Sequence, residues 1–272
     1  MGAMAGRPLW TPSQARIDAS ELTRFQRDTE RLTGRTFGSY AELHQWSVDD
    51  APSFWARVWD HGGVIGDHGA RLVADADRLP GARFLPDARL NYAENLLRGD
   101  DRRIAIVATA EDGRIRTLTV GDLRKNAARV SHALRASGVG PGDRVAGVMA
   151  NVPEAVIALL ACATIGAVWS SCSPDFGADG IVDRFGQIEP VLLIAVDGYM
   201  YGGRVFDCRE KIAEVTRRIP SIQATVMVSF AGLAPPSEVA APGWLTWNDW
   251  CDGHDDHWPV YERWPFDQPL YI

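Results

Sequence analysis

The sequence has almost no lysine. Of its 28 basic residues, only Lys125 and Lys211 are lysine and all the others are arginine. Anion contacts would therefore mostly use the forked guanidinium group, which can bind a phosphate or carboxylate through two hydrogen bonds. The formal net charge of -7 argues against a sequence-independent nucleic-acid binder, because such a protein needs a basic face. Local arginines can still bind a small anionic ligand.

Cysteine is scarce too, and its spacing fits neither a C-x-x-C pair nor a zinc pattern. The four cysteines are Cys162, Cys172, Cys208 and Cys251. Since no secretory signal is visible, we expect reduced thiols, no metal ligands and a cytoplasmic protein. Residues 1–8 are interpreted as a cloning remnant and disordered start. The longest apolar run, Val156–Val168, has 13 residues and is too short to span a bilayer, so we expect no membrane partner.

Phosphate loops and catalytic sets are absent as well. No G-x-G-x-x-G follows a predicted strand, no G-x-x-x-x-G-K-[ST] occurs, and no Ser-His-Asp or Cys-His set can be assembled. The glycine-rich Gly138–Val145 contains Pro141 and is interpreted as a helix-to-strand connector. The run HDDH, His254–His257, could hold a metal, but adjacent residues rarely converge on one ion, so a solvated acidic loop is favoured. We therefore assign no catalytic residue.

What is present is a helical beginning followed by alternating strands and helices. Ser20 and Gly34 mark the ends of one early helix, and Ser39 with Glu42 has the capping-box spacing of another. Further helices are expected at 51–63 and 89–99, the latter with Leu90, Ala93, Leu96 and Leu97 on one face. Beyond them, strands are expected at 103–109, 114–120, 143–150, 167–172, 191–196, 224–229 and 269–272, and helices at 122–139, 153–166, 179–190 and 209–220.

This order predicts an α/β fold. Continuous apolar strands that alternate with helices indicate a parallel-type sheet with helices on both faces, preceded by a helical N-terminal segment. We expect the helical segment at residues 9–100 and the α/β subdomain at residues 101–272. The segment after Phe230 is interpreted as loop up to the final strand.

Two segments follow predicted strands at their carboxyl ends, where parallel sheets bind ligands. SPDFGADG, Ser173–Gly180, can line a site, or it can simply turn the chain and cap the next helix. YGGRV, Tyr201–Val205, has two glycines that allow close backbone approach and an arginine that suits phosphate, or it is a flexible loop. The residues alone leave both alternatives open.

Longer motifs carry a resemblance to a known family. PDARLNYAENLL, WSVDDAPSFWARVWD and the stretch from RVAGVMANVPEAV to DRFGQIEP resemble the adenylate-forming acyl-CoA synthetases, over about Leu9 to Ile272. The detail SSCSPDFG…DRFGQIEP is most similar to members that activate acetoacetate; acetate and propionate stay open as alternatives. In this family, a strand similar to PLYI leads into a phosphate loop, so we expect an N-terminal piece that is inactive alone.

The resemblance implies a two-step ligase with small-molecule substrates. The acid attacks the α-phosphate of ATP, and coenzyme A then displaces AMP; ATP, Mg²⁺ and coenzyme A are the implied cofactors, used with a C-terminal part that this chain lacks. By motif position, Ser173–Asp175 and Tyr201–Arg204 correspond to loops that contact coenzyme A. Relatives carry Gly-Gly at Pro174-Asp175 and arginine at Tyr201, whereas Gly203-Arg204 is kept. The cofactor-binding candidates are Ser173, Asp175, Tyr201, Gly203 and Arg204. A non-catalytic binding or scaffold domain is the alternative of another class.

Overall fold

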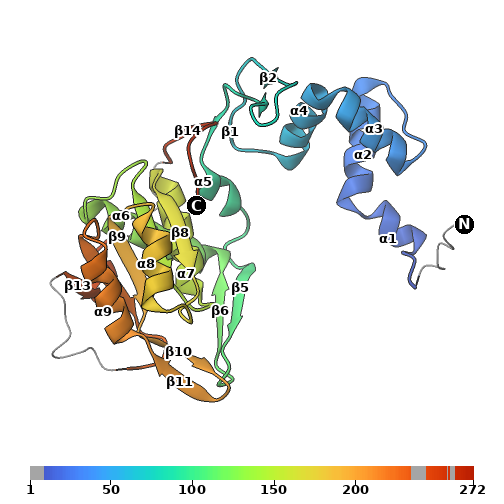
Figure 1. Ribbon diagram of the computed structural model, residues 1–272. Helices are drawn as coiled ribbons and strands as arrows, with labels where there is room; N and C mark the ends of the chain where they lie inside the picture. Colours follow the sequence, from blue (N-terminus) through green and yellow to red (C-terminus); the bar gives the residue numbers. More distant parts are fainter. Residues whose placement is uncertain (1–8, 234–242, 256, 258–260) are drawn as a thin grey trace, which may run out of the picture. The chain divides into compact units, whose positions relative to one another are not determined.

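The structure is a computed structural model, and it describes residues 9–233, 243–255, 257 and 261–272. The chain forms two compact units, Met1–Ala88 and Arg89–Ile272. Each is described by itself below, and Figure 1 gives the ribbon with its element labels.

The first unit is mainly helical, as expected. Its helices are α1 (Gln14–Asp18), α2 (Glu21–Thr33), α3 (Tyr40–Asp49) and α4 (Ala51–Gly62), and its short strands are β1 (Gly66–Asp67), β2 (Val73–Ala74) and β3 (Arg83–Phe84). The predicted ends of α2 are confirmed, because Ser20 accepts a hydrogen bond from the Thr23 amide and Gly34 has a φ of 71°. The predicted capping box of α3 is only half formed: Ser39 accepts from Glu42 N, but the Glu42 carboxylate accepts from Gly38 N.

Aromatic residues form the small core of this unit. Phe25, Phe37, Leu43 and Trp46 are buried together. The Phe25 and Phe54 rings meet edge to face with centroids 5.8 Å apart, and Trp46 meets Phe54 at the same distance. Such edge-to-face contacts follow from the negative faces and positive edges of the rings. Aromatic packing therefore joins α2, α3 and α4.

An ion pair between Arg71 and Asp87 joins the two ends of the segment that follows β1 in this unit, and it predicts a pH effect. The Arg71 guanidinium donates to Asp87, with Nε 2.9 Å from Oδ2, and this holds the pKa of the Asp87 carboxyl at about 2, below its ordinary 3.8. A lowered folded-state pKa means that the pair stabilises the fold above the unfolded pKa and that this contribution is lost as pH falls from about 4 through about 2. We expect an NMR titration of the Asp87 carboxyl to give this low pKa, and Arg71→Met to return it towards its ordinary value. An unchanged pKa in Arg71→Met would contradict the assignment.

The second unit is the predicted α/β fold. Its helices are α5 (Tyr92–Leu96), α6 (Val120–Ala136), α7 (Pro153–Ile165), α8 (Ala178–Gly186), α9 (Arg209–Arg218) and α10 (Trp247–Cys251). Its strands are β4 (Arg89–Leu90), β5 (Ile104–Thr109), β6 (Ile115–Thr119), β7 (Arg144–Val148), β8 (Val168–Cys172), β9 (Leu192–Val196), β10 (Gly198–Tyr201), β11 (Arg204–Asp207), β12 (Ala224–Val228), β13 (Trp244–Thr246) and β14 (Trp264–Pro265). Among the described residues, no helix is long and apolar enough to cross a bilayer.

Five parallel strands form the main sheet, in the order β13-β12-β9-β7-β8. The chain runs from β7 outwards to β8 and then returns past β7 to β9, so the strand order reverses beside β7. Such a reversal places a crevice outside the carboxyl ends of the strands, where ligands bind in open α/β sheets. The antiparallel pairs β5–β6 and β10–β11 form two hairpins in addition to the sheet, and Figure 1 shows both extending from the same end of the unit.

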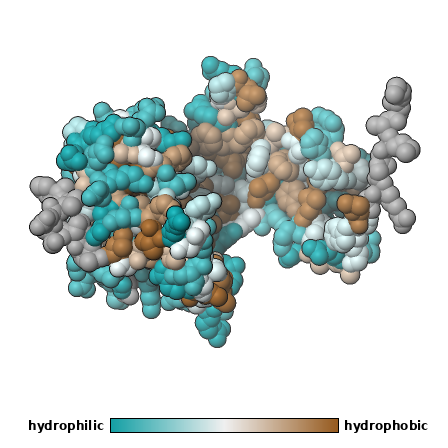
Figure 2. All heavy atoms as spheres, turned by 60° about the horizontal axis from the view of Figure 1, so that its bottom comes forward, coloured by the Kyte–Doolittle hydropathy of each residue, from teal (hydrophilic) through white to brown (hydrophobic). Residues whose placement is uncertain are grey.

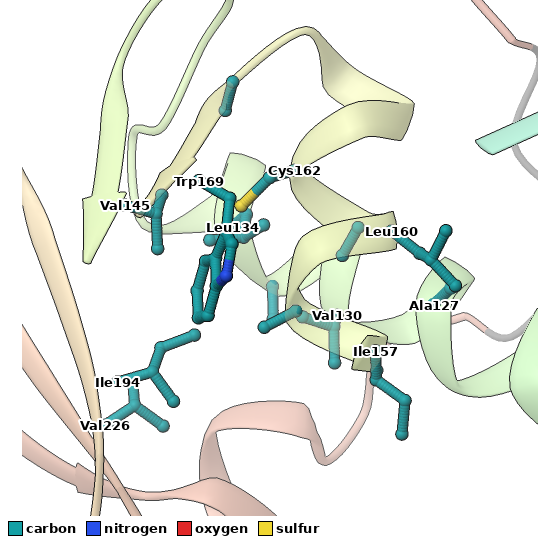
Figure 3. Packing of buried hydrophobic residues seen from close by; sticks show 14 of the residues in the cluster. Ala127, Val130, Leu134, Val145, Ile157, Leu160, Cys162, Trp169, Ile194 and Val226 are labelled. Atoms are coloured by element: carbon teal, nitrogen blue, oxygen red, sulfur yellow. The ribbon is translucent and has the colours of Figure 1, made fainter. Parts of the chain in front are cut away.

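Helices cover both faces of the sheet. On one face, residues of α6 and α7 pack on apolar side chains of β7, β9 and β12. Figure 3 shows the indole of Trp169 between the helix residue Leu134 and the strand residue Ile194. On the other face, α8 and α9 bury Phe185, Ile212 and Val215 against Leu193 and neighbouring strand residues. This two-sided burial explains why the strands read as continuous apolar runs.

Three sequence expectations need correction or completion in this unit. Leu96 does not share the buried face of α5, because it is 51% exposed while Ala93 and Leu97 are buried. The segment after Phe230 is not all loop, since it contains β13 and α10. The predicted final strand is confirmed in part: Tyr271 forms a parallel bridge with Trp169, and Ile272 N donates to Trp169 O over 2.9 Å.

The surface of this unit is mixed. On the face that Figure 2 presents, polar side chains dominate and apolar ones are scattered among them.

The four cysteines carry no disulfide. Burial raises the pKa of the Cys251 thiol to about 12 and also raises that of the Cys162 thiol. These two thiols therefore act as small apolar side chains at neutral pH.

Candidate functional site

The carboxyl edge of the parallel sheet gathers the candidate residues. Ser173 and Asp175 follow β8, whereas Tyr201, Gly203 and Arg204 follow β9. Because the strands are parallel, both segments leave the sheet at the same edge. The structure therefore places all five candidates at the end where an α/β sheet presents its ligand-binding loops.

Tyr201, Gly203 and Arg204 lie at the tip of the β10–β11 hairpin. Gly202 and Gly203 form its two-residue turn, with φ values of 58° and 72°. Both values are in the left-handed region, which a type I′ hairpin turn requires and which glycine adopts without strain. The segment is therefore a hairpin turn and not an irregular loop, and the two glycines have a structural reason in the turn itself.

The hairpin pairing brings two of the candidates together. Tyr201 is paired with Arg204 across the two strands, so their side chains share one face of the hairpin. Tyr201 is 73% exposed, and Arg204 is exposed with no ion-pair partner among the described residues. An open aromatic ring beside an open guanidinium can stack on a planar group and bind an anion.

The same face continues towards the sheet. Side chains two residues apart on a strand share a face, and Tyr199 stacks on Phe206 with ring centroids 5.1 Å apart. Burial raises the pKa of Tyr199, and negative charge on Cys208 and Asp175 adds to the effect. Asp175 therefore acts electrostatically on Tyr199, near the start of the hairpin.

The loop after β8 is held by the start of α9. The Pro174 carbonyl accepts a hydrogen bond from Lys211 Nζ and lies 3.9 Å from Cys208 Sγ. Ser173 and Asp175, on either side, are exposed. The loop thus presents two polar side chains from a fixed backbone.

Positive charge collects at this edge in spite of the acidic composition. Lys211 lies against the loop after β8, and the Arg184 guanidinium sits 4.6 Å above the Phe176 ring centroid. With Arg204 they give three cations from three elements. The nearby thiols are not nucleophiles at neutral pH, because burial raises the pKa of Cys172 to about 11 and also raises that of Cys208.

A small pocket opens beside the first hairpin. Its volume is about 80 Å³, and it is lined by residues of β5, β6, the start of α7 and the loop after β12, including Arg114, Arg116, Asn151 and Phe230. The guanidinium of Arg116 is already paired with Glu154 over 2.8 Å. The pocket is too small for a nucleotide, since pockets for drug-sized ligands measure roughly 300–1,000 Å³. This pocket by itself is therefore not a nucleotide site.

Sequence reasoning missed three residues that organise this edge. They are Asp197 after β9, Glu111 in the β5–β6 turn and Arg114 directly before β6. A carboxylate directly after a continuous apolar strand was the available signal for Asp197. Nothing in the local sequence indicates the contacts of Glu111 and Arg114, which join segments about a hundred residues apart.

The HDDH run shows no ligand cluster in the part that the structure describes. His257 Nδ1 contacts the Asp255 carboxylate, and Asp256 lies outside the described residues. No group of three or more His, Cys, Asp or Glu side chains among the described residues could hold a metal ion.

Comparison with known families decides the family. Residues 94–259 match the family model described as AMP-binding enzyme, and residues 40–96 match that described as Acetyl-coenzyme A synthetase N-terminus. The first match spans more than half of the chain. The chain belongs to the AMP-binding enzyme family. This membership agrees with the resemblance seen in the sequence motifs and with the parallel sheet of the second unit.

Several AMP-binding enzymes resemble the chain along almost its whole length. It is 43% identical over 268 residues to the acetoacetyl-coenzyme A synthetase of Rhizobium meliloti, covering 98% of this chain and 41% of the relative. It is 35% identical to the acetoacetyl-CoA synthetase of Danio rerio, over 99% of this chain. A solved structure, acetoacetyl-CoA synthetase from Streptomyces lividans, matches with a TM-score of 0.90 and 41% identity, covering 98% of this chain and 41% of that one. The chain thus spans about two fifths of the length of the relatives it matches.

Proposed function

We propose that this chain works as part of an acid–thiol ligase that converts acetoacetate, ATP and coenzyme A to acetoacetyl-CoA, AMP and pyrophosphate. The observation that carries the proposal is the 43% identity with an acetoacetyl-coenzyme A synthetase over 98% of the chain. Membership of the AMP-binding enzyme family supports a reaction through an acyl-adenylate. We further propose a cytoplasmic location, in keeping with the four unpaired cysteines.

In the proposed reaction, a carboxylate oxygen of the acid bonds to the α-phosphorus of ATP as the bond to pyrophosphate breaks. The thiolate of coenzyme A then bonds to the acyl carbon, the bond to AMP breaks, and the thiol proton goes to solvent. Family chemistry implies Mg²⁺, but the described residues offer no ligand cluster for it. We therefore place no metal in the described part of the chain and derive no step through one.

The contribution of this chain is nucleotide binding for the second step. Coenzyme A carries phosphates and an adenine ring, which match an open guanidinium beside an open aromatic ring. Arg204 and Tyr201 supply this pair at the tip of the β10–β11 hairpin, and Gly203 belongs to the turn that holds them together. Ser173 and Asp175 lie in the loop after β8, at the same carboxyl edge of the sheet. We propose that these five residues form one side of the coenzyme A site.

Arg204→Ala tests this assignment in the full-length protein. A hydrogen bond between charged groups contributes roughly 1.5–3 kcal/mol, and about 1.4 kcal/mol is a factor of ten. We therefore expect the KM for coenzyme A to rise roughly tenfold or more. The adenylation half-reaction, measured by pyrophosphate exchange, needs no coenzyme A and is expected to stay unchanged.

Arg217→Ala is the matched control. Arg217 is an exposed arginine near the C-terminal end of α9, which leads to the opposite, amino-terminal edge of the sheet. Removing it takes away the same charge, and we expect no change in either half-reaction. Equal behaviour of Arg204→Ala and the parent would make Arg204 a solvated surface residue. A parallel fall in adenylation would make it structural.

The match of residues 40–96 to an acetyl-coenzyme A synthetase model favours a second candidate in the same class, with acetate or propionate as the acid. Rates of pyrophosphate release by the full-length protein with acetoacetate, acetate and propionate separate the two. A higher kcat/KM for acetate or propionate would replace the first proposal with the second. Absence of pyrophosphate release with all three acids would favour a non-catalytic binding domain.

A further inference from the structure

The tip of the β10–β11 hairpin contacts the turn of the other hairpin. Gly203 N donates a hydrogen bond to Glu111 Oε1 over 3.2 Å, joining residues 92 positions apart in the chain. Figure 1 shows the two hairpins at the same end of the second unit. Gly203 is the residue directly before Arg204, so this contact acts on the backbone that presents the guanidinium.

The turn that carries Glu111 is itself fixed. Arg114, three residues later, donates from Nη2 to the Phe230 carbonyl over 3.0 Å, and its guanidinium lies 5.4 Å from the centroid of the Phe230 ring. Phe230 belongs to the loop after β12, and its amide donates to the Asp197 carboxylate over 2.8 Å. The β5–β6 turn is therefore attached to the sheet edge and does not move freely with the hairpin tip.

The base of the β10–β11 hairpin is held by the same loop. A Cβ added to Gly198 would lie 2.6 Å from the Phe206 carbonyl and 3.0 Å from Ala231 Cβ, so the backbone is closely packed there. A continuous series of contacts therefore connects the hairpin base with the hairpin tip. It passes through the loop after β12 and the β5–β6 turn. Without Glu111 the contact at the hairpin tip is lost, and the tip is where the Gly-Gly turn resists bending least.

We propose that Glu111 is a positioning residue for the coenzyme A step, which acts by tying the Gly203 amide and thereby fixing Arg204 beside Tyr201. This inference rests on the proposed function, because the proposed function assigns coenzyme A as the ligand that Arg204 binds. Glu111 itself does not touch the ligand. Loss of the Glu111 side chain lets the hairpin tip move. Ordering the tip then reduces the free energy gained when the phosphate binds.

The first test needs no ligand and uses the chain as it stands. We expect the Gly203 amide to exchange its hydrogen faster in Glu111→Ala than in the parent, while the amides of β9 exchange at unchanged rates. Glu111→Gln keeps the Oε1 acceptor without the charge and is expected to restore most of the protection. An unchanged exchange rate of the Gly203 amide in Glu111→Ala would contradict the proposed hydrogen bond between Gly203 and Glu111.

The second test measures the KM for coenzyme A in the full-length protein. We expect Glu111→Ala to raise it about threefold, with unchanged pyrophosphate exchange, because an exposed hydrogen bond contributes less than a buried one. In the double variant with Arg204→Ala, we expect no rise beyond that of Arg204→Ala alone, since Glu111 acts through Arg204. Glu214→Ala on α9, which pairs with Arg218, is the acidic control with no expected effect.

Each remaining outcome decides against the inference in a different way. A lower KM in Glu111→Ala would make Glu111 a competitor of the phosphate for the Gly203 amide. Additive effects in the double variant would make Glu111 independent of Arg204. If Arg204→Ala leaves the KM unchanged, the proposed function of the hairpin fails and the positioning role fails with it, whereas the exchange experiment still decides whether the tie exists.

Discussion

Asp197→Ala is expected to destabilise the second unit by about 3–5 kcal/mol. The Asp197 side chain is buried, with 4% exposure, directly after the central strand β9. Its carboxylate accepts hydrogen bonds from three backbone amides in the loop after β12, at 2.8 to 2.9 Å, and from Ser229 Oγ at 3.3 Å. Hydrogen bonds to a charged group contribute about 1.5–3 kcal/mol each and are not additive when they share one acceptor.

Hydrogen exchange of the β9 amides measures this change in the second unit alone, because the most protected amides exchange through global unfolding. Asp197→Asn keeps one acceptor oxygen, and we expect it to cost about half as much as alanine. Asp175→Ala, an exposed carboxylate at the same edge, is the control with little expected effect. A loss below about 1 kcal/mol in Asp197→Ala would mean that water replaces the carboxylate at these amides.

The sheet and its covering helices could be predicted because their signals are local. Apolar runs such as Leu192–Val196 have no polar side, which only a strand buried on both faces allows. Helix ends were equally local, as Ser20 and Gly34 show. The membership of these strands in one sheet followed from the alternation of elements, although their order in the sheet did not.

The β10–β11 hairpin was missed for a physical reason. Its strands have four residues each, and most of the side chains from Tyr201 to Asp207 are exposed, so no apolar alternation marks them. The Gly-Gly turn was the available signal, because two consecutive glycines suit a type I′ turn. Once the hairpin is recognised, the pairing of Tyr201 with Arg204 follows directly.

The location of the candidate site could be predicted from the sequence, but the contacts that support its residues could not. Ser173, Asp175, Tyr201, Gly203 and Arg204 all lie at the predicted sheet edge, and their role in binding coenzyme A stays a prediction. The contacts that support them depend on Glu111, Arg114 and Asp197, which come from three separate segments. Contacts of this kind join distant parts of the chain and leave no periodic pattern. The predicted division at residue 100 also stays a prediction.

Ile194→Ala is the second large effect that we expect, at about 2–5 kcal/mol of destabilisation of the second unit. Ile194 lies in β9, between β7 and β12, with no exposed surface. Figure 3 shows it beside Val226 and facing the Trp169 indole, so its removal leaves a cavity that these neighbours can fill only in part. The cost combines the lost transfer of three carbon atoms from water with the cavity left behind.

Two matched substitutions make this expectation specific. Ile194→Val removes one carbon atom and is expected to cost about 0.5–1.5 kcal/mol. Ile115→Ala in β6 makes the same chemical change at a side chain that is 65% exposed, and we expect less than about 1 kcal/mol, which covers the loss of strand propensity. Exchange of the β7 and β12 amides reports all three variants. Equal losses at Ile194 and Ile115 would contradict the placement of β9 at the centre of the sheet, because the same chemical change is expected to cost much more at a buried side chain than at an exposed one.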